Sequence, residues 1–507
     1  MDRSHFHTIF LVQTARFAKV GNVNNPASRP NILFLVPEDM GLQLGCYGDP
    51  HARTPNIDEL ARHGVRFSQA TTPYSICSPS RACALTGLYP HQNGHIGLAT
   101  HCFELYRPDT PNIITHLRAG GYRTGIVGKL HVNPESAFPF DYHAIPGANF
   151  DRKTPMEAYV DSARKFWSEA KGQPWFLSVN FPDAHLPFVR TVDGRPAHPQ
   201  TAEEVKLPSW VGADSPRLRE ETANYYNCIA RVDAWIGHIL AALKNDGQAE
   251  NTMVIFMCDH GPQFPRGKGT VYQGAIQVPL IMRGPGVATP GSVRHELVSN
   301  VDLLPTVLQA ARLSLPERLP GRPLQPLLAA APPTDWGGFQ FAMTTGSFPQ
   351  NCFIQESFRL DRWKLIWTPP QPRPNNIAAS YLDPKHFVTV PTGLDAGERA
   401  ALSPMVAAAY LQWEYPPEYL LYDLADDPDE WHDLAQDPQH AGDLKRLVAA
   451  HHEFQHNTLD PFSDPANLKA FIREQADYFD WRYKTTPNFQ WAHVAAFRQW
   501  RETRKRT

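Results

Sequence analysis

Cysteine is scarce in this chain and forms no recognisable framework. The 507 residues include seven cysteines, an odd number, and no two of them are spaced as a Cys-x-x-Cys pair. Domains held by disulfides carry dense sets of cysteines, and structural zinc sites use closely spaced pairs. This cysteine usage therefore fits a chain that relies on neither. The seven cysteines are at positions 46, 77, 83, 102, 228, 258 and 352.

Long hydrophobic runs are also missing. A membrane helix needs roughly 18 or more apolar residues in a row, and no stretch of the sequence approaches that length. The apolar segment 7–12 is followed by Gln13, Arg16 and Lys19 and by no small-x-small cleavage site, so it makes a poor signal peptide. We therefore expect no membrane partner and favour a cytoplasmic location, with a periplasmic or secreted location as the alternative.

An excess of charge of one sign is lacking too. The formal net charge is −3, so no global basic field points to nucleic acid, and we expect no such partner. An anionic substrate would have to be held by local cations. With 42% apolar and 20% charged residues, the composition is that of an ordinary globular protein.

Four apolar runs predict strands that are buried on both faces of a central sheet. They cover residues 31–36, 123–127, 175–181 and 251–258. Apolar residues at helical spacing over 218–244 predict a helix that covers this sheet. These elements predict an α/β fold.

The chain divides into four predicted parts. These are an N-terminal extension (1–29), a catalytic domain (30–335), a C-terminal subdomain with a small antiparallel sheet (336–460) and a helical extension (461–507). A Pro- and Ala-rich stretch at 316–333 is the expected linker. Short strands of the second layer are expected at 339–344, 363–367 and 419–424.

Polar side chains follow each of the four buried runs. They are Glu38 and Asp39, Lys129 and His131, Asp183 and His185, and Asp259 and His260. Open α/β sheets place their sites at the carboxyl ends of the strands, so we expect these residues to share one site. In an extended segment, Lys129 and His131 would point to the same side. Asp183 is close enough in sequence to orient His185, and a cap of a turn is the alternative for it. Adjacent carboxylates at a strand end are costly unless a cation lies beside them.

Cys77 opens a segment, Cys-Ser-Pro-Ser-Arg, that is suited to meet an oxyanion. Pro79 can occupy the first position of a helix, because it gives up only an N–H that would be unpaired there. A helix that begins near Pro79 would aim its free N–H groups at whatever Cys77 contacts. Arg81 adds a permanent cation in the same turn. A buried structural cysteine is the alternative reading of Cys77 itself.

The longer pattern resembles a family signature. Cys77-x-Pro-Ser-Arg81-x-x-x-Leu-Thr-Gly87 is similar to the signature of type I sulfatases, in which this cysteine is oxidised to formylglycine. Gly-Lys-Leu-His at 128–131 and Asp-His-Gly-x-x-Phe-Pro-x-Gly-Lys at 259–268 resemble the sulfamidase subgroup. The resemblance covers roughly residues 30–460. It implies an alkaline-phosphatase-like fold: a large mixed sheet flanked by helices, with a smaller C-terminal α+β subdomain.

The resemblance also implies a metal and a set of catalytic side chains. Ca²⁺ is the family-based choice, with Mn²⁺ or Mg²⁺ as alternatives, and the implied ligands are Glu38, Asp39, Cys77, Asp259 and His260. The implied catalytic residues are Cys77, Arg81, Lys129, His131, His185 and Lys268. This chain departs from the pattern in three places. The family usually has Asp where this chain has Glu38, and sulfamidase has Asn and Arg where it has His260 and Lys268.

The implied reaction is hydrolysis of a sulfate ester or sulfamate. Hydrated formylglycine attacks sulfur while Arg81, Lys129 and Lys268 hold the sulfuryl oxygens; His185 protonates the leaving group and His131 then accepts a proton. The expected substrate is N-sulfoglucosamine, as at the non-reducing end of heparan sulfate fragments, with an O-sulfated sugar next. A phosphonate or phosphodiester hydrolase is one alternative, and an inactive protein that binds sulfated glycans is another. A formylglycine-generating enzyme is an expected partner, and a homo-oligomer is left open.

The sequence leaves open the roles of some histidines and the packing of the C-terminal extension. His91 and His95 could be loop residues or substrate contacts. A second group is expected on a solvated helix face rather than around a metal: His451, His452 and His456. The C-terminal extension could pack on the core, on a neighbouring subunit or near the site, and it carries Trp481, Trp491 and Trp500.

Overall fold

The computed structural model describes residues 29–505, and its centre is a mixed eight-stranded sheet. β1 (Asn31–Val36) lies near the middle of the sheet and pairs in parallel with β6 (Trp175–Asn180) and β7 (Thr252–Met257). All six residues of β1 are buried, as expected for a strand covered on both faces. The strand order is β5 (Tyr142–Ala144), β4 (Arg123–Val127), β6, β1, β7, β8 (Leu280–Arg283), β2 (Val65–Phe67) and β9 (Ser292–Arg294).

The four predicted buried runs are the four central parallel strands. β4, β6, β1 and β7 all run in the same direction, while β8 is antiparallel to both β7 and β2. The carboxyl ends of the four parallel strands therefore meet at one edge of the sheet. The predicted extension 1–29 lies outside the described residues except for its last residue, Arg29.

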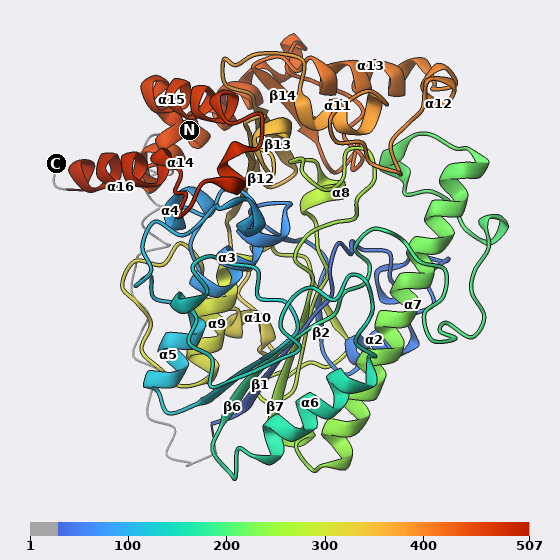
Figure 1. Ribbon diagram of the computed structural model, residues 1–507, viewed down its shortest axis with the longest axis vertical. Coiled ribbons are helices and arrows are strands. Elements are labelled where there is room, and N and C mark those ends of the chain that lie inside the picture. The colour runs from blue at the N-terminus through green and yellow to red at the C-terminus, as the bar shows by residue number, and fades with distance from the viewer. Residues whose placement is uncertain (1–28, 506–507) are drawn as a thin grey trace.

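Helices cover both faces of the sheet (Figure 1). One face packs against α2 (Pro55–Arg62), α6 (Glu157–Ser168) and the 30-residue α7 (Pro216–Asn245), which contains the helix predicted at 218–244. The other face packs against α3 (Cys77–Thr86), α5 (Ile113–Ala119), α9 (Leu303–Ala310) and α10 (Gln325–Leu328). The stretch 316–333 was expected to be a linker, but Leu324, Leu327 and Leu328 are fully buried in this second core. That part of the stretch belongs to the packed domain, so the expectation of a linker is wrong there.

The C-terminal part contains a four-stranded antiparallel sheet. Its order is β11 (Phe339–Thr344), β12 (Gln355–Leu360), β13 (Trp363–Trp367) and β14 (Tyr419–Asp423). The sequence predicted β11, β13 and β14 but not β12. Helices that share apolar clusters with this sheet are α11 (Asn376–Leu382), α13 (Pro404–Glu414) and α14 (Ala441–Thr458), and the short helix α12 (Ala396–Ala400) precedes α13 in the chain.

The C-terminal extension packs on the core. α15 (Pro465–Asp477) and α16 (Ala492–Arg504) share an apolar cluster with residues of β11, β12 and α14. Figure 1 shows both helices beside α14, above the end of the sheet where α3 begins. Trp491 is buried, and its indole N–H donates to the carbonyl of His101 at 3.0 Å. Among the helices of residues 29–505, none is both long enough and apolar enough to cross a membrane.

Candidate active site

Four potential metal ligands gather at the carboxyl ends of β1 and β7. Asp39 follows β1, Asp259 and His260 follow β7, and Cys77 is the first residue of α3. One ligand atom from each lies within 4.8 Å of those of the other three, and all four residues are buried. His260 Nε2 is 3.4 Å from Cys77 Sγ and 3.4 Å from Asp39 Oδ1.

The free atoms of this group fit a divalent cation. Asp39 Oδ1 and Asp259 Oδ2 are buried and accept no hydrogen bond from any described residue. His260 Nδ1 donates to the carbonyl of Gly261 (2.9 Å), which leaves Nε2 as the ring nitrogen that faces the carboxylates. Burial lowers the pKa of His260, but Asp259, Asp39 and Cys77 outweigh it and raise the pKa to about 9. The surroundings of His260 thus favour positive charge, and the donor set of oxygen, nitrogen and sulfur suits a metal.

Glu38 does not join this group. Its Oε1 accepts a hydrogen bond from Arg81 Nη2, and its Oε2 accepts one from Lys129 Nζ at 2.6 Å. Burial raises the pKa of Glu38, yet Arg81 and Lys129 hold it well below the usual value. Glu38 therefore lies outside the four-residue group, and its expected role as a metal ligand stays a prediction. Both of its carboxylate oxygens are bound by cations.

Cys77 itself begins α3, two residues earlier than predicted, so Pro79 occupies the third helical position rather than the first. The Cys77 side chain therefore lies at the helix end that carries free N–H groups and the positive dipole. Cys77 is only 2% exposed. Burial raises the pKa of its thiol, but Lys129 and Lys268 outweigh burial and the pKa is lowered.

Three cations surround the same space. Lys268 Nζ donates to Asp39 Oδ2 at 2.7 Å, and Lys129 Nζ is held by Glu38. Arg81 Nε lies 3.5 Å from Asp259 Oδ2, so the guanidinium joins Glu38 to the four-residue cluster. Arg81, Lys129 and Lys268 are at least nine-tenths buried. They can neutralise an anion that binds beside Cys77.

His185 lies near these groups but is not oriented by Asp183. Its Nδ1 donates to the carbonyl of Leu186 at 2.7 Å. Asp183 instead accepts hydrogen bonds from Arg152 (2.7 Å) and Arg231 (2.8 Å), so the expectation that it orients the ring directly is wrong. Burial, followed by Lys268, lowers the pKa of His185.

His131 lies close enough to Lys129 to feel its charge, but the segment between them is not extended. Its φ is +57°, which breaks the alternation assumed from the sequence. Both of its ring nitrogens are buried, and within residues 29–505 neither has a hydrogen-bond partner. Burial and the neighbouring Lys129 lower the pKa of His131 to about 3, so the ring is neutral and one of its nitrogens has a lone pair that can accept a proton.

Comparison with known proteins gives the family of this chain. A family model described as sulfatase matches residues 30–313, which is more than half of the chain. The chain belongs to the sulfatase family. A second model, described as N-sulphoglucosamine sulphohydrolase, C-terminal, matches residues 266–387. The protein is thus a hydrolase of sulfuric esters or sulfamates by family.

Two curated human relatives align with most of this sulfatase. Human N-sulphoglucosamine sulphohydrolase is 31% identical over 474 residues, which is 86% of this chain and 92% of the relative. Human arylsulfatase A is 30% identical over 457 residues, which is 80% of this chain and 84% of the relative.

Solved structures confirm the alkaline-phosphatase-like fold. One is a complex with its substrate D-glucosamine-2-N,6-O-disulfate; it has a TM-score of 0.64 and 20% identity and covers 85% of this chain and 99% of its own. Another, a phosphonate monoester hydrolase from Silicibacter pomeroyi, has a TM-score of 0.63 and 20% identity and covers 85% and 96%. At these identities the likeness concerns the fold alone.

Sequence reasoning missed Asn180 in this sulfatase. Asn180 ends β6, and its Oδ1 accepts a hydrogen bond from Arg81 Nη1 at 2.7 Å. The same Nη1 also donates to the carbonyl of Lys129 at 3.1 Å. Asn180 therefore helps to fix the guanidinium that faces the site. Its signal was a polar residue at the end of an otherwise mainly apolar strand.

The structure also places the other histidines that the sequence analysis named. His91 and His95 are fully buried. His452 and His456 are exposed as predicted, but His451 is buried and its Nε2 lies 2.7 Å from Glu356 Oε2. The expectation of a solvated face is thus wrong for His451, because a carboxylate of β12 pairs with it.

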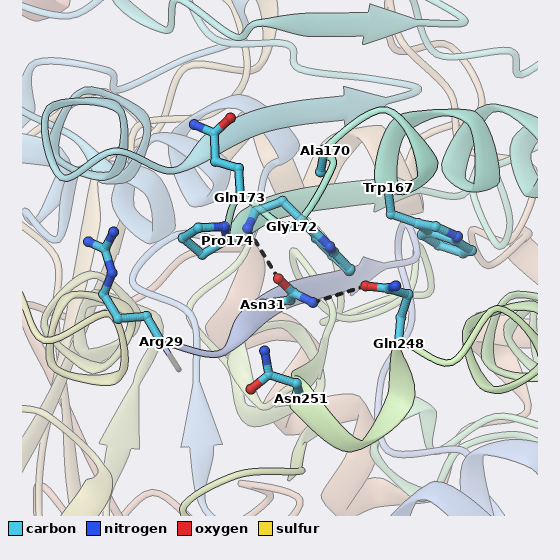
Figure 2. A pocket seen from close by; sticks show the side chains of 10 residues that line it. Arg29, Asn31, Trp167, Ala170, Gly172, Gln173, Pro174, Gln248 and Asn251 are labelled. Carbon is cyan, nitrogen blue, oxygen red and sulfur yellow. Dashed lines mark hydrogen bonds between the residues drawn. The ribbon is translucent and has the colours of Figure 1, made fainter. Parts of the chain in front are cut away.

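A pocket of about 210 Å³ lies at the opposite edge of the sheet, where β1, β6 and β7 begin. Figure 2 shows Asn31 at its centre, bonded to Gln248 at 3.3 Å. Its lining consists of amide, aromatic and small side chains with Arg29, and includes no acid, cysteine or histidine. This pocket offers no group for hydrolysis, so we place the reaction at the Cys77 edge.

Proposed function

We propose that this sulfatase hydrolyses the sulfamate of N-sulfoglucosamine or of a related sulfated glycan fragment. The observation that carries the proposal is the buried group of Asp39, Cys77, Asp259 and His260 with Arg81, Lys129 and Lys268 around it. The alignment with human N-sulphoglucosamine sulphohydrolase over 92% of that protein supports the choice of substrate. So does the match to the C-terminal model of the same name.

The side chains of the site divide the work between binding and proton transfer. Arg81, Lys129 and Lys268 would bind the oxygens of the sulfuryl group and offset its charge. His185 would give the proton on Nε2 to the leaving nitrogen as the N–S bond breaks, because its Nδ1 is engaged by Leu186. His131, neutral and with both nitrogens free, would accept a proton when sulfate leaves.

Two groups complete the proposed site. Oxidation of Cys77 by a formylglycine-generating enzyme would replace the thiol with a hydrated aldehyde. A divalent cation, Ca²⁺ by family and Mn²⁺ or Mg²⁺ as alternatives, would be held by Asp39, Asp259, His260 and residue 77, where it would act as a Lewis acid toward the hydroxyl at that position. His260 makes a transition metal more plausible than four oxygen ligands would.

The test is sulfate release from N-sulfoglucosamine and from glucosamine 6-sulfate. The protein is co-produced with a formylglycine-generating enzyme, and Cys77→Ala is the control. Release from the N-sulfated sugar that the control loses supports the proposal. Release from glucosamine 6-sulfate alone keeps the reaction and rejects the proposed substrate. No release from either, with the aldehyde confirmed by mass spectrometry, rejects both sugars.

Phosphonate or phosphodiester hydrolysis is the second candidate. His260 favours it, because a nitrogen ligand beside two carboxylates departs from the sulfamidase pattern, and the fold matches a phosphonate monoester hydrolase. Turnover of a phenyl phosphonate monoester that exceeds turnover of both sugars would select this candidate. An inactive glycan-binding protein would instead keep Cys77 unmodified, bind sulfated sugar and release no sulfate.

A further inference from the structure

Phe150 lies flat against His185. The two ring centroids are 3.8 Å apart and the ring planes differ by 14°, which is a close parallel stack. The Phe150 ring also lies beside Lys129, whose Nζ is 4.7 Å from the ring centroid. One aromatic ring thus touches both the residue that would protonate the leaving group and a cation that would bind the sulfuryl oxygens. We propose that Phe150 is a positioning residue that aims His185 Nε2 at the leaving group; this rests on the proposed role of His185.

The backbone of Phe150 is tied to the backbone of the His185 loop by a single guanidinium. Arg152 Nη1 donates to the carbonyl of Phe150 at 2.5 Å. Its Nη2 donates to the carbonyls of His185 (3.3 Å) and Pro187 (3.2 Å) and to Asp183 Oδ1 (2.7 Å). The two stacked rings therefore stand on segments that Arg152 holds at a fixed separation.

Arg231 anchors this assembly to the fold. It projects from the middle of α7 and its Nε donates to Asp183 Oδ2 at 2.8 Å. Asp183 is thereby shared between Arg152 and Arg231, and Arg231 is 2% exposed. The aim of the His185 ring is set through Phe150, Arg152 and Asp183 by the long helix that covers the sheet.

The stack with Phe150 restricts the tilt of the His185 ring, which the hydrogen bond of the ring does not. The single bond from Nδ1 to Leu186 leaves the ring free to tilt about that bond, and tilting moves Nε2 sideways. A flat aromatic neighbour blocks tilting on one face. General acids contribute about 10²–10⁴-fold to rate, and a misplacement of about 1 Å can cost about 10²-fold. Loss of the stack should therefore reduce catalysis by roughly 10–100-fold when the leaving group needs a proton.

The experiment compares two leaving groups. Phe150→Leu removes the flat ring but keeps a half-buried apolar side chain; Phe150→Tyr keeps the ring and should restore the wild-type rate. Phe188→Leu is the matched control, because Phe188 follows His185 by three residues but packs on Tyr225 and Phe264. We expect Phe150→Leu to lower kcat on N-sulfoglucosamine about 10–100-fold. On 4-nitrophenyl sulfate, whose phenolate leaves without protonation, we expect a change below about 3-fold.

The variant His185→Gln tests the proposed role of His185 as proton donor separately from the proposed role of Phe150 as positioning residue. If His185 is the proton donor, His185→Gln also slows the sugar far more than the aryl sulfate, and adding Phe150→Leu to it costs nothing further. If His185→Gln shows this pattern and Phe150→Leu slows both substrates equally or changes KM alone, the positioning role is wrong and the acid role stands. If His185→Gln slows both substrates equally, the acid role itself fails.

A spectroscopic measurement tests the stack without turnover. A proton above an aromatic face is shifted upfield by the ring current, so the His185 ring protons should appear upfield in histidine-labelled protein and move downfield in Phe150→Leu but not in Phe150→Tyr. The His185→Gln spectrum assigns the signal. Unchanged His185 shifts in Phe150→Leu would overturn the inference even if neither substrate is cleaved.

Discussion

Replacing Glu38 by glutamine separates ion pairing from metal binding at the Cys77 edge. Both oxygens of the Glu38 carboxylate are bound by buried cations, Arg81 and Lys129, and Glu38 is 1% exposed. Removing one partner of a buried ion pair costs about 3–5 kcal/mol, because the remaining charge stays buried without compensation. Glu38→Gln removes the carboxylate partner of Lys129 and leaves Arg81 with its 3.5 Å contact to Asp259, so we expect a loss in the free energy of unfolding within that range.

The assay is urea unfolding at pH 7, with chelator and again with Ca²⁺. The pKa of Glu38 is lowered, so its contribution to stability is fully present above the unfolded pKa of about 4.5 and is lost as pH falls through the folded pKa. At 100 times its Kd, Ca²⁺ should add about 2.7 kcal/mol to wild type. We expect Glu38→Gln to keep this increment and Asp259→Asn to lose it. An unchanged stability in chelator would refute the ion-pair assignment, and loss of the Ca²⁺ increment in Glu38→Gln would show that Glu38 also binds the metal.

Three further outcomes follow from the described contacts. Asp183→Asn should lower the free energy of unfolding by about 3–5 kcal/mol, because Arg231 and Arg152 lose a buried partner; a urea midpoint equal to wild type would contradict this. The kcat/KM for N-sulfoglucosamine should fall as pH rises through a pKa below 6.5, because only protonated His185 can donate a proton and burial with Lys268 lowers its pKa. His185→Gln should remove this fall in kcat/KM. A flat profile of wild-type kcat/KM between pH 5 and 8 would count against His185 as the proton donor. Trp491→Ala should destabilise the protein by about 3–5 kcal/mol, measured by urea unfolding. Trp500→Ala should cost less because Trp500 is only half-buried. A urea midpoint of Trp491→Ala equal to that of wild type would contradict the packing of the extension on the core.

The position of the site could be predicted because it depends on local features of the sequence. Asp39, Asp259 and His260 directly follow buried strands, and parallel pairing brings the ends of those strands together whatever the loops do. The same reasoning placed Lys129 and His185 at the edge where Cys77 lies. Their chemical roles were implied by resemblance and stay predictions until activity is measured.

The partners of the charged groups could not be predicted in this way. Asp183 pairs with Arg231, 48 residues away, and Glu356 pairs with His451, 95 residues away. No local pattern records such pairs, because they depend on how separate elements pack. β12 was missed for the same reason: its Glu356 and Arg359 look exposed in sequence, but distant partners satisfy them inside the fold.

The burial of Cys77 limits the time during which another enzyme could oxidise it. In the folded protein the thiol is 2% exposed and lies against His260, which follows it by 183 residues in the chain. A second enzyme has no access to a side chain so enclosed, so the proposed oxidation of Cys77 to formylglycine would have to come before β7 closes over the site. At a synthesis rate of about 5–20 residues per second, roughly 10–40 seconds separate the appearance of Cys77 from that of His260. If Cys77 is oxidised as proposed, the fraction of active protein in a cell depends on whether oxidation is complete before the segment with His260 is made. Slowing translation between these two residues should then raise that fraction.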